Sequence, residues 1–197
     1  LERESALLAL DGAVSAMRQG RGAVALVSGA QGIGKTSLIS RFTRGLDDAV
    51  RILWGTCDDL LTPRPLGPFR DIAASTSGHV QDSLAEAGRP HQFHTALLAE
   101  LDSGEPSVLV IEDVHWADDA TLDAVTVIGR RIRDLPALLV LSFRSDDVAA
   151  DHPLHAALEA VQRNTSLHLP LRPLSRSAVA ELAGEESDRI YAMTGGN

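Results

Sequence analysis

The chain has 197 residues, 44% of them hydrophobic, which is enough to bury one sizeable core. Its formal net charge is -9, and its densest basic cluster is only Arg130, Arg131 and Arg133, which argues against direct binding of a nucleic acid backbone. No apolar run approaches the ~20 residues that a membrane span requires, and the single cysteine, Cys57, cannot form an internal disulfide, so we expect a cytoplasmic protein.

Helical and strand-like patterns alternate along the chain. Residues 5–19 have the apolar spacing of an amphipathic helix. A further helix is predicted from about Thr36, another over the stretch that contains Phe93 and Leu97, and another over the stretch from Leu122 to Ile132. Short continuous apolar runs, typical of strands buried on both faces, are 23–28, 107–113 and 137–143. Two further strands are predicted over 51–56 and 166–171.

Strands that alternate with helices predict an α/β fold, a parallel sheet covered by helices on both faces. The three prolines of 57–71 predict an irregular loop there. A helix is expected to begin at Ser175, and another at Ser187 as the start of a C-terminal helical domain truncated at Asn197. The predicted domains are therefore 1–186, with helix 5–19 leading in, and 187–197.

The segment GAQGIGKT, residues 29–36, satisfies the pattern G-x-x-x-x-G-K-[ST] at every fixed position between a predicted strand and helix. Its inward amides and the positive end of the following helix can solvate a polyphosphate. Lys35, the only lysine, is expected to reach the β- and γ-phosphates, the Thr36 hydroxyl to ligate Mg2+, and Ser37 to contact the α-phosphate. The predicted nucleotide-binding residues of this P-loop are Gly29, Ala30, Gly32, Ile33, Gly34, Lys35, Thr36 and Ser37.

Two carboxylates end the apolar run that begins at Ser107. Ligands of parallel sheets bind at the carboxyl ends of the strands, so Glu112 and Asp113 are expected beside the P-loop. One carboxylate in such a pair holds magnesium, and the other can orient the attacking water. We assign Glu112 to the metal and Asp113 to the water, and the reverse assignment stays open.

Seven segments in order along nearly the whole chain carry a family resemblance: LERE, GAQGIGKTSL, CDDLLTPRPLGPF, VLVIEDVHWAD, LLVLSFRSDD, LRPLS and YAMTGGN. Together they resemble the STAND branch of AAA+-like P-loop ATPases, most of all the ATPase domain of large LuxR-type bacterial transcriptional regulators. The resemblance implies that Arg144 is a sensor of the γ-phosphate, that Arg3 borders the adenine and that Pro173 closes the other side of the base.

One feature departs from the family, in which an aspartate usually stands at the metal position. Here Glu112 comes first and Asp113 second, which shifts each carboxylate by about one methylene. A misplacement of ~1 Å can cost ~10²-fold in rate, so we expect slow hydrolysis. Slow turnover suits a switch whose state depends on the bound nucleotide.

The leading interpretation is an ATP hydrolase that binds ATP or ADP with Mg2+ and acts as a switch in a bacterial signalling or transcriptional regulator. Lys35, Asp113 and Arg144 are its predicted catalytic residues, and nucleotide-dependent self-association is an expected property. A DNA-binding module is left open for a longer chain. The alternative is a non-hydrolysing module that keeps an adenine nucleotide as a structural latch, and the order of the two acids favours it.

Three other P-loop classes fit the sequence less well. A small-molecule kinase would need an arginine-rich lid, and 144–163 offers only Arg144 and Arg163. A GTPase would need an N-K-x-D motif, but the only lysine already lies in the P-loop. An ABC-type ATPase would show an S-G-G-Q-like segment before the acidic strand, and the sequence has none.

Overall fold

The computed structural model describes residues 2–74, 76, 78–85, 90–146, 148–149 and 151–197. Its helices and strands are α1 (Glu4–Met17), β1 (Ala23–Ser28), α2 (Lys35–Arg44), β2 (Arg51–Thr56), α3 (Gly67–Ala73), α4 (Gly78–Ala85), α5 (Pro90–Leu101), β3 (Ser107–Glu112), α6 (Asp119–Arg131), β4 (Ala137–Phe143), α7 (Leu154–Val161), β5 (Thr165–Pro170), α8 (Arg176–Ala183) and α9 (Ser187–Thr194). Short 3-10 turns are η1 (Val114–Trp116), η2 (Ile132–Asp134), η3 (Gln162–Asn164) and η4 (Gly184–Glu186).

Within the described residues, five strands form one sheet in the order β2-β3-β4-β1-β5. Every neighbouring pair is parallel, so all the carboxyl ends lie at one edge. The three strands β1, β3 and β4 are buried along their whole length, as their continuous apolar runs predict. The predicted parallel α/β sheet is confirmed.

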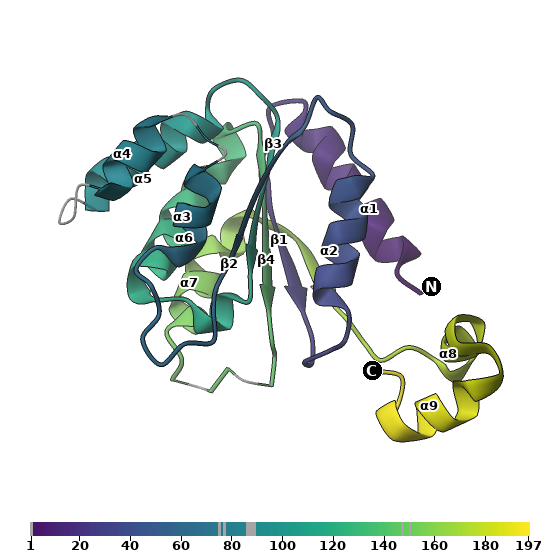
Figure 1. Ribbon diagram of the computed structural model, residues 1–197. Helices are drawn as coiled ribbons and strands as arrows, with labels where there is room; N and C mark the ends of the chain where they lie inside the picture. Colours follow the sequence, from purple (N-terminus) through teal and green to yellow (C-terminus); the bar gives the residue numbers. More distant parts are fainter. Residues whose placement is uncertain (1, 75, 77, 86–89, 147, 150) are drawn as a thin grey trace.

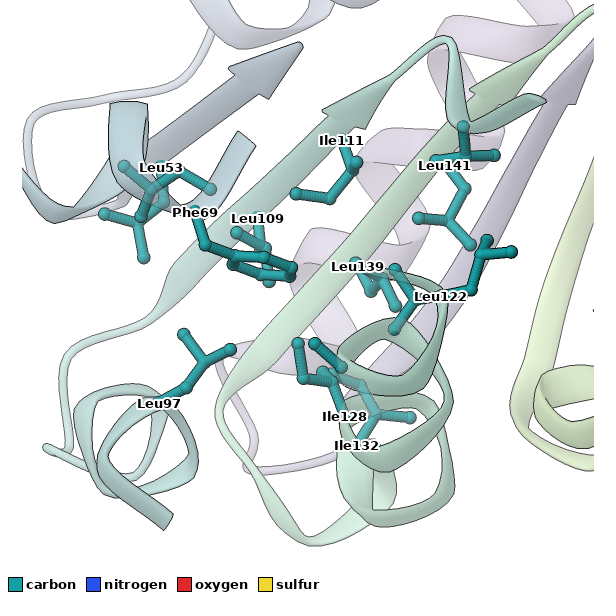
Figure 2. Packing of buried hydrophobic residues seen from close by; sticks show 14 of the residues in the cluster. Leu53, Phe69, Leu97, Leu109, Ile111, Leu122, Ile128, Ile132, Leu139 and Leu141 are labelled. Atoms are coloured by element: carbon teal, nitrogen blue, oxygen red, sulfur yellow. The ribbon is translucent and has the colours of Figure 1, made fainter. Parts of the chain in front are cut away.

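Helices cover both faces of the sheet (Figure 1). On one face α1 and α2 pack on the sheet through a cluster that includes Leu10, Ile39 and Phe42. On the other face α3 to α7 enclose a larger cluster, in which Phe69 and Phe93 meet edge to face with 5.3 Å between ring centroids. Figure 2 shows side chains of this second cluster, contributed by strands and helices alike. The two clusters fix the sheet that carries the site.

Two helices differ from the sequence prediction. Helix α3 begins at Gly67, inside the predicted loop 57–71, because Pro68 is well suited to a first turn and Phe69 and Ile72 are fully buried behind it. Helix α7 was not predicted, although Leu154, Ala157 and Val161 are buried at helical spacing. Both are short, so packing decides their structure more than local sequence does: α3 packs on β2, and α7 packs on α6.

Helices α8 and α9 lie beyond the sheet, below α2 in the view of Figure 1. Ser175 caps α8 as predicted, since its Oγ accepts a hydrogen bond from the Ala178 amide at 3.2 Å. Helix α9 starts at Ser187 and ends at Thr194, and Gly195 after it adopts a left-handed conformation with φ 62°. The two helices pack on each other. The domain boundary between 186 and 187 stays a prediction.

In the part of the chain that the structure describes, no helix is both long and apolar enough to cross a membrane.

Candidate functional site

The P-loop connects the end of β1 to the first turn of α2. Gly32 and Gly34 have φ of 75° and 94°, a region that residues with a Cβ rarely adopt. These angles turn the chain sharply before α2, whose first amides have no partner within the helix. The segment is therefore a compact loop at a helix N-terminus, which is a suitable site for an anion.

Lys35 is buried, with 7% of its surface exposed. Its Nζ donates hydrogen bonds to the carbonyl oxygens of Gly29 and Ala30, both at 2.9 Å. The Lys35 ammonium is thus hydrogen-bonded to the loop to which Lys35 itself belongs. A cation in this place can attract a polyphosphate to the loop amides.

Glu112 ends β3 on the face of the sheet that α2 covers. It is 5% exposed, and its Oε2 accepts a hydrogen bond from the Trp54 indole at 3.2 Å. Its Oε1 is buried and has no hydrogen-bond partner among the described residues. Burial raises the pKa of Glu112 and the Asp113 charge adds to this, while Thr36, Trp54 and Lys35 favour the ionised form.

The residues around Glu112 fit a magnesium ion. Mg2+ prefers oxygen ligands and keeps several of its waters. Oε1 of Glu112 is a buried acceptor that lacks a partner, and the Thr36 hydroxyl is near enough to lower the pKa of Glu112, although no hydrogen bond of good geometry reaches Oε1. A hydrated cation would satisfy that oxygen and offset the cost of its burial.

Asp113 follows β3 in a left-handed conformation, with φ 53° and ψ 44°. Its amide donates a hydrogen bond to the Ser142 hydroxyl at 3.0 Å, and its Oδ1 lies 3.9 Å from His115 Nδ1. The carboxylate is 24% exposed at the edge where the P-loop also lies. Sequence reasoning missed Ser142, and the one available signal was a hydroxyl within the apolar run of β4.

Arg144 directly follows β4 at the same edge of the sheet. Its guanidinium carbon lies 4.4 Å from the centroid of the Trp116 ring, a cation–π arrangement. The Trp116 ring in turn lies against the His115 ring in a tilted arrangement, with 4.5 Å between the ring centroids. The structure therefore connects Arg144 through two rings to the turn that carries Asp113.

The remaining predicted residues lie on the other side of the P-loop. Arg3 Nη2 donates to the carbonyl oxygens of Ile33 at 3.3 Å and of Arg172 at 2.8 Å. Pro173 is exposed and follows Arg172 directly. The predicted adenine-bordering segments thus lie side by side and beside the loop. Leu1 and Asp147, which belong to two of the family-like segments, lie outside the described residues.

The C-terminal segment also reaches the P-loop. Asn197 Nδ2 donates to the Gln31 carbonyl oxygen at 2.8 Å, and the Leu174 amide donates to the Gly196 carbonyl oxygen at 2.8 Å. The end of the family-like segment YAMTGGN therefore contacts the P-loop at Gln31.

A family model for the AAA ATPase domain matches residues 1–141. The chain belongs to this family of AAA ATPase domains. The match covers the P-loop, Glu112 and Asp113, and it ends within β4. No curated protein matches the chain in sequence.

Solved structures share the AAA ATPase fold at low sequence identity. The ORC2 protein of Aeropyrum pernix, solved in ADPNP–ADP complexes, has a TM-score of 0.63 at 14% identity, over 94% of this chain and 51% of that one. A Walker-type ATPase of Pyrococcus abyssi has a TM-score of 0.52 at 11% identity, over 99% and 59%. A STAND protein of Pyrococcus horikoshii with a tetratricopeptide repeat sensor has a TM-score of 0.50 at 17% identity, over 93% and 27%. The chain spans about half the length of the ORC2 protein, and these likenesses show the fold alone.

Glu112→Gln is expected to raise the melting temperature of the metal-free AAA ATPase domain at neutral pH. The folded state raises the pKa of Glu112 above its ordinary 4.5, so burial of the ionised form destabilises the fold above that raised pKa. As the pH falls through the raised pKa, the carboxyl takes up a proton and this destabilisation disappears. Thermal unfolding in EDTA, measured at stepped pH values from neutral toward 4.5, should show a gain that shrinks toward acid. A gain that grows toward acid would contradict it.

Proposed function

We propose that this AAA ATPase domain binds ATP or ADP with Mg2+ and hydrolyses ATP slowly, as a nucleotide-dependent switch. One observation carries the proposal: the P-loop at the N-terminus of α2 lies next to Glu112, a buried carboxylate whose Oε1 has no hydrogen-bond partner among the described residues. A magnesium–polyphosphate complex requires an anion site for the phosphates and, next to it, a carboxylate oxygen for the hydrated metal.

The positions of the side chains support the following roles. The amides of Gly29–Ser37 cradle the phosphates, and Lys35 neutralises charge on the β- and γ-oxygens. Thr36 and Glu112 would hold the metal, Glu112 through water. Bound magnesium would neutralise charge that develops on the transferred phosphoryl group. Asp113 orients the attacking water from the edge of the sheet.

Arg144 would contribute a second cation to the γ-phosphate, in addition to Lys35. In the proposed ATP-bound state its guanidinium turns toward the γ-phosphate and gives up part of its contact with the Trp116 ring. We propose that this exchange reports the nucleotide state to the η1 turn.

We propose further that the domain belongs to a bacterial signalling or transcriptional regulator of the STAND and LuxR type. The support is the order of the seven segments along the sequence together with the AAA family match. In this proposal the α/β domain 1–186 and the helical segment 187–197 change their contact with the nucleotide state, and self-association follows that change. Binding of DNA is left to parts of a longer protein.

A non-hydrolysing nucleotide latch is the second candidate. The order Glu112–Asp113 favours it, and so does the contact of Arg144 with the Trp116 ring. In this case the domain would bind ADP as a structural element and release no phosphate.

The nucleotide released from freshly purified, denatured protein tests the proposal. We expect an adenine nucleotide, and we expect calorimetric titration of the emptied protein with ATP to show tighter binding in Mg2+ than in EDTA. GTP in place of an adenine nucleotide, or no affinity for either nucleotide, would contradict the proposal. Phosphate release above the background of the protein-free buffer separates the switch from the latch.

A further inference from the structure

Trp54 donates the hydrogen bond that positions the carboxylate of Glu112. The Nε1–Oε2 distance is 3.2 Å, and the same carboxylate keeps Oε1 unsatisfied among the described residues. The interaction is charge-assisted when Glu112 is ionised, which makes it stronger than a bond between neutral groups. The two oxygens of Glu112 are thus unequal: one is engaged by the indole, and the other is available.

The register of the sheet creates this contact. Trp54 pairs with Val110, and Thr56 pairs with Glu112, between the parallel strands β2 and β3. Because side chains alternate along a strand, Trp54, Val110 and Glu112 share one face, and Glu112 is the diagonal neighbour of Trp54. That face is the one that α2 covers, since Val110 belongs to the cluster with Leu38 and Ile39.

Trp54 is held firmly enough to orient its neighbour. It is partly buried and packs against the α2-side cluster, which also contacts Ile52 two residues earlier on the same face. The indole has only an N–H donor and no acceptor, so it can bond the carboxylate but cannot bind the cation itself. Such an outer partner fixes a ligand without replacing it.

The contact also bears on the unusual glutamate. An aspartate at position 112 would withdraw the carboxylate from the indole by about one carbon–carbon bond, ~1.5 Å. At that position the Trp54 donor would lose its acceptor. The hydrogen bond between Trp54 and residue 112 therefore requires the longer glutamate side chain.

We propose that Trp54 is a positioning residue for the magnesium ion: its indole fixes Oε2 of Glu112 so that Oε1 faces the hydrated cation beside Thr36. The inference rests on the proposed Mg2+–nucleotide function and extends it to a residue on an edge strand. Trp54 itself touches neither the cation nor the nucleotide.

The test compares the Mg2+ requirement for ATP binding in Trp54→Phe and wild type, measured by calorimetry at stepped Mg2+ concentrations. Phenylalanine keeps the ring that packs on the cluster and removes the donor. We expect the Mg2+ concentration for half-maximal binding to rise about 10-fold or more, as is typical when an outer partner of a ligand is lost. Affinity for ATP in EDTA should stay the same.

Ile52→Ala is the matched control, because it shortens a side chain on the same face of β2 that makes no polar contact with Glu112. Its Mg2+ requirement should match the wild type.

A double-mutant cycle separates positioning from a structural effect. In the Glu112→Asp background, where the acceptor is withdrawn, Trp54→Phe should change the Mg2+ requirement by less than about twofold. An equal rise in both backgrounds, or no rise in Trp54→Phe alone, overturns the inference while leaving Mg2+–ATP binding by the wild type intact. A wild type that binds no adenine nucleotide overturns the proposed function and the inference together.

Discussion

Lys35→Ala is expected to weaken ATP binding about 100-fold and to reduce hydrolysis to background. Lys35 is the only lysine of the chain, and its ammonium is held on the P-loop by the Gly29 and Ala30 carbonyl oxygens. Loss of one preorganised donor to a developing charge costs about 10²–10³ in rate. Because the loop amides and the α2 N-terminus remain, a weak affinity for phosphate should persist. Calorimetry and phosphate release measure the two effects.

Arg44→Ala is the matched control for this loss of charge. Arg44 is exposed in the last turn of the same helix, so its removal changes the net charge equally but leaves the N-terminal loop intact. We expect its ATP affinity to stay within about twofold of the wild type, as for substitutions at distant, independent sites. Equal losses in both variants would show that bulk charge, and not the P-loop ammonium, governs binding.

The sequence predicts the sheet and the P-loop well for a local reason. Strands such as 23–28 and 137–143 are continuous apolar runs, so their burial on both faces can be predicted without knowing which strands lie beside them. The loop is similarly local, because one short segment supplies the glycines, the lysine and the hydroxyl. Its position at one edge with Glu112 and Asp113 then follows from the parallel arrangement of the strands.

What the sequence could not predict depends on register and packing between distant segments. Trp54 meets Glu112 only because β2 and β3 pair with Thr56 opposite Glu112. Ser142 meets the Asp113 amide only because β4 ends beside β3, and neither partner is marked by a motif. Helix α7 is too short for local propensity to decide, so its burial against α6 determines it. The family resemblance pointed to Arg144, but only the folded structure brings the Trp116 ring beneath its guanidinium.

Asp113→Asn is expected to lower ATP hydrolysis about 100-fold or more while ATP affinity changes little. In the proposed function the substitution removes the charge that orients and polarises the attacking water, a contribution of about 10²–10⁴ for general acid–base groups. It also preserves the backbone, because asparagine tolerates the left-handed φ of 53° and the Ser142 hydroxyl accepts from the amide, not from the side chain. Single-turnover phosphate release, with calorimetry of ATP binding, measures both quantities.

The comparison with Glu112→Gln decides which acid serves which role. If Glu112 holds the metal, its amide variant should weaken Mg2+-dependent binding, whereas Asp113→Asn should spare binding and reduce turnover. The reverse pattern would exchange the two assignments and move the metal toward Asp113, which is 24% exposed and lies 3.9 Å from His115. Unchanged turnover in Asp113→Asn would remove the water-orienting carboxylate from this site. Hydrolysis would then have to rely on Glu112, whose buried Oε1 has no hydrogen-bond partner among the described residues.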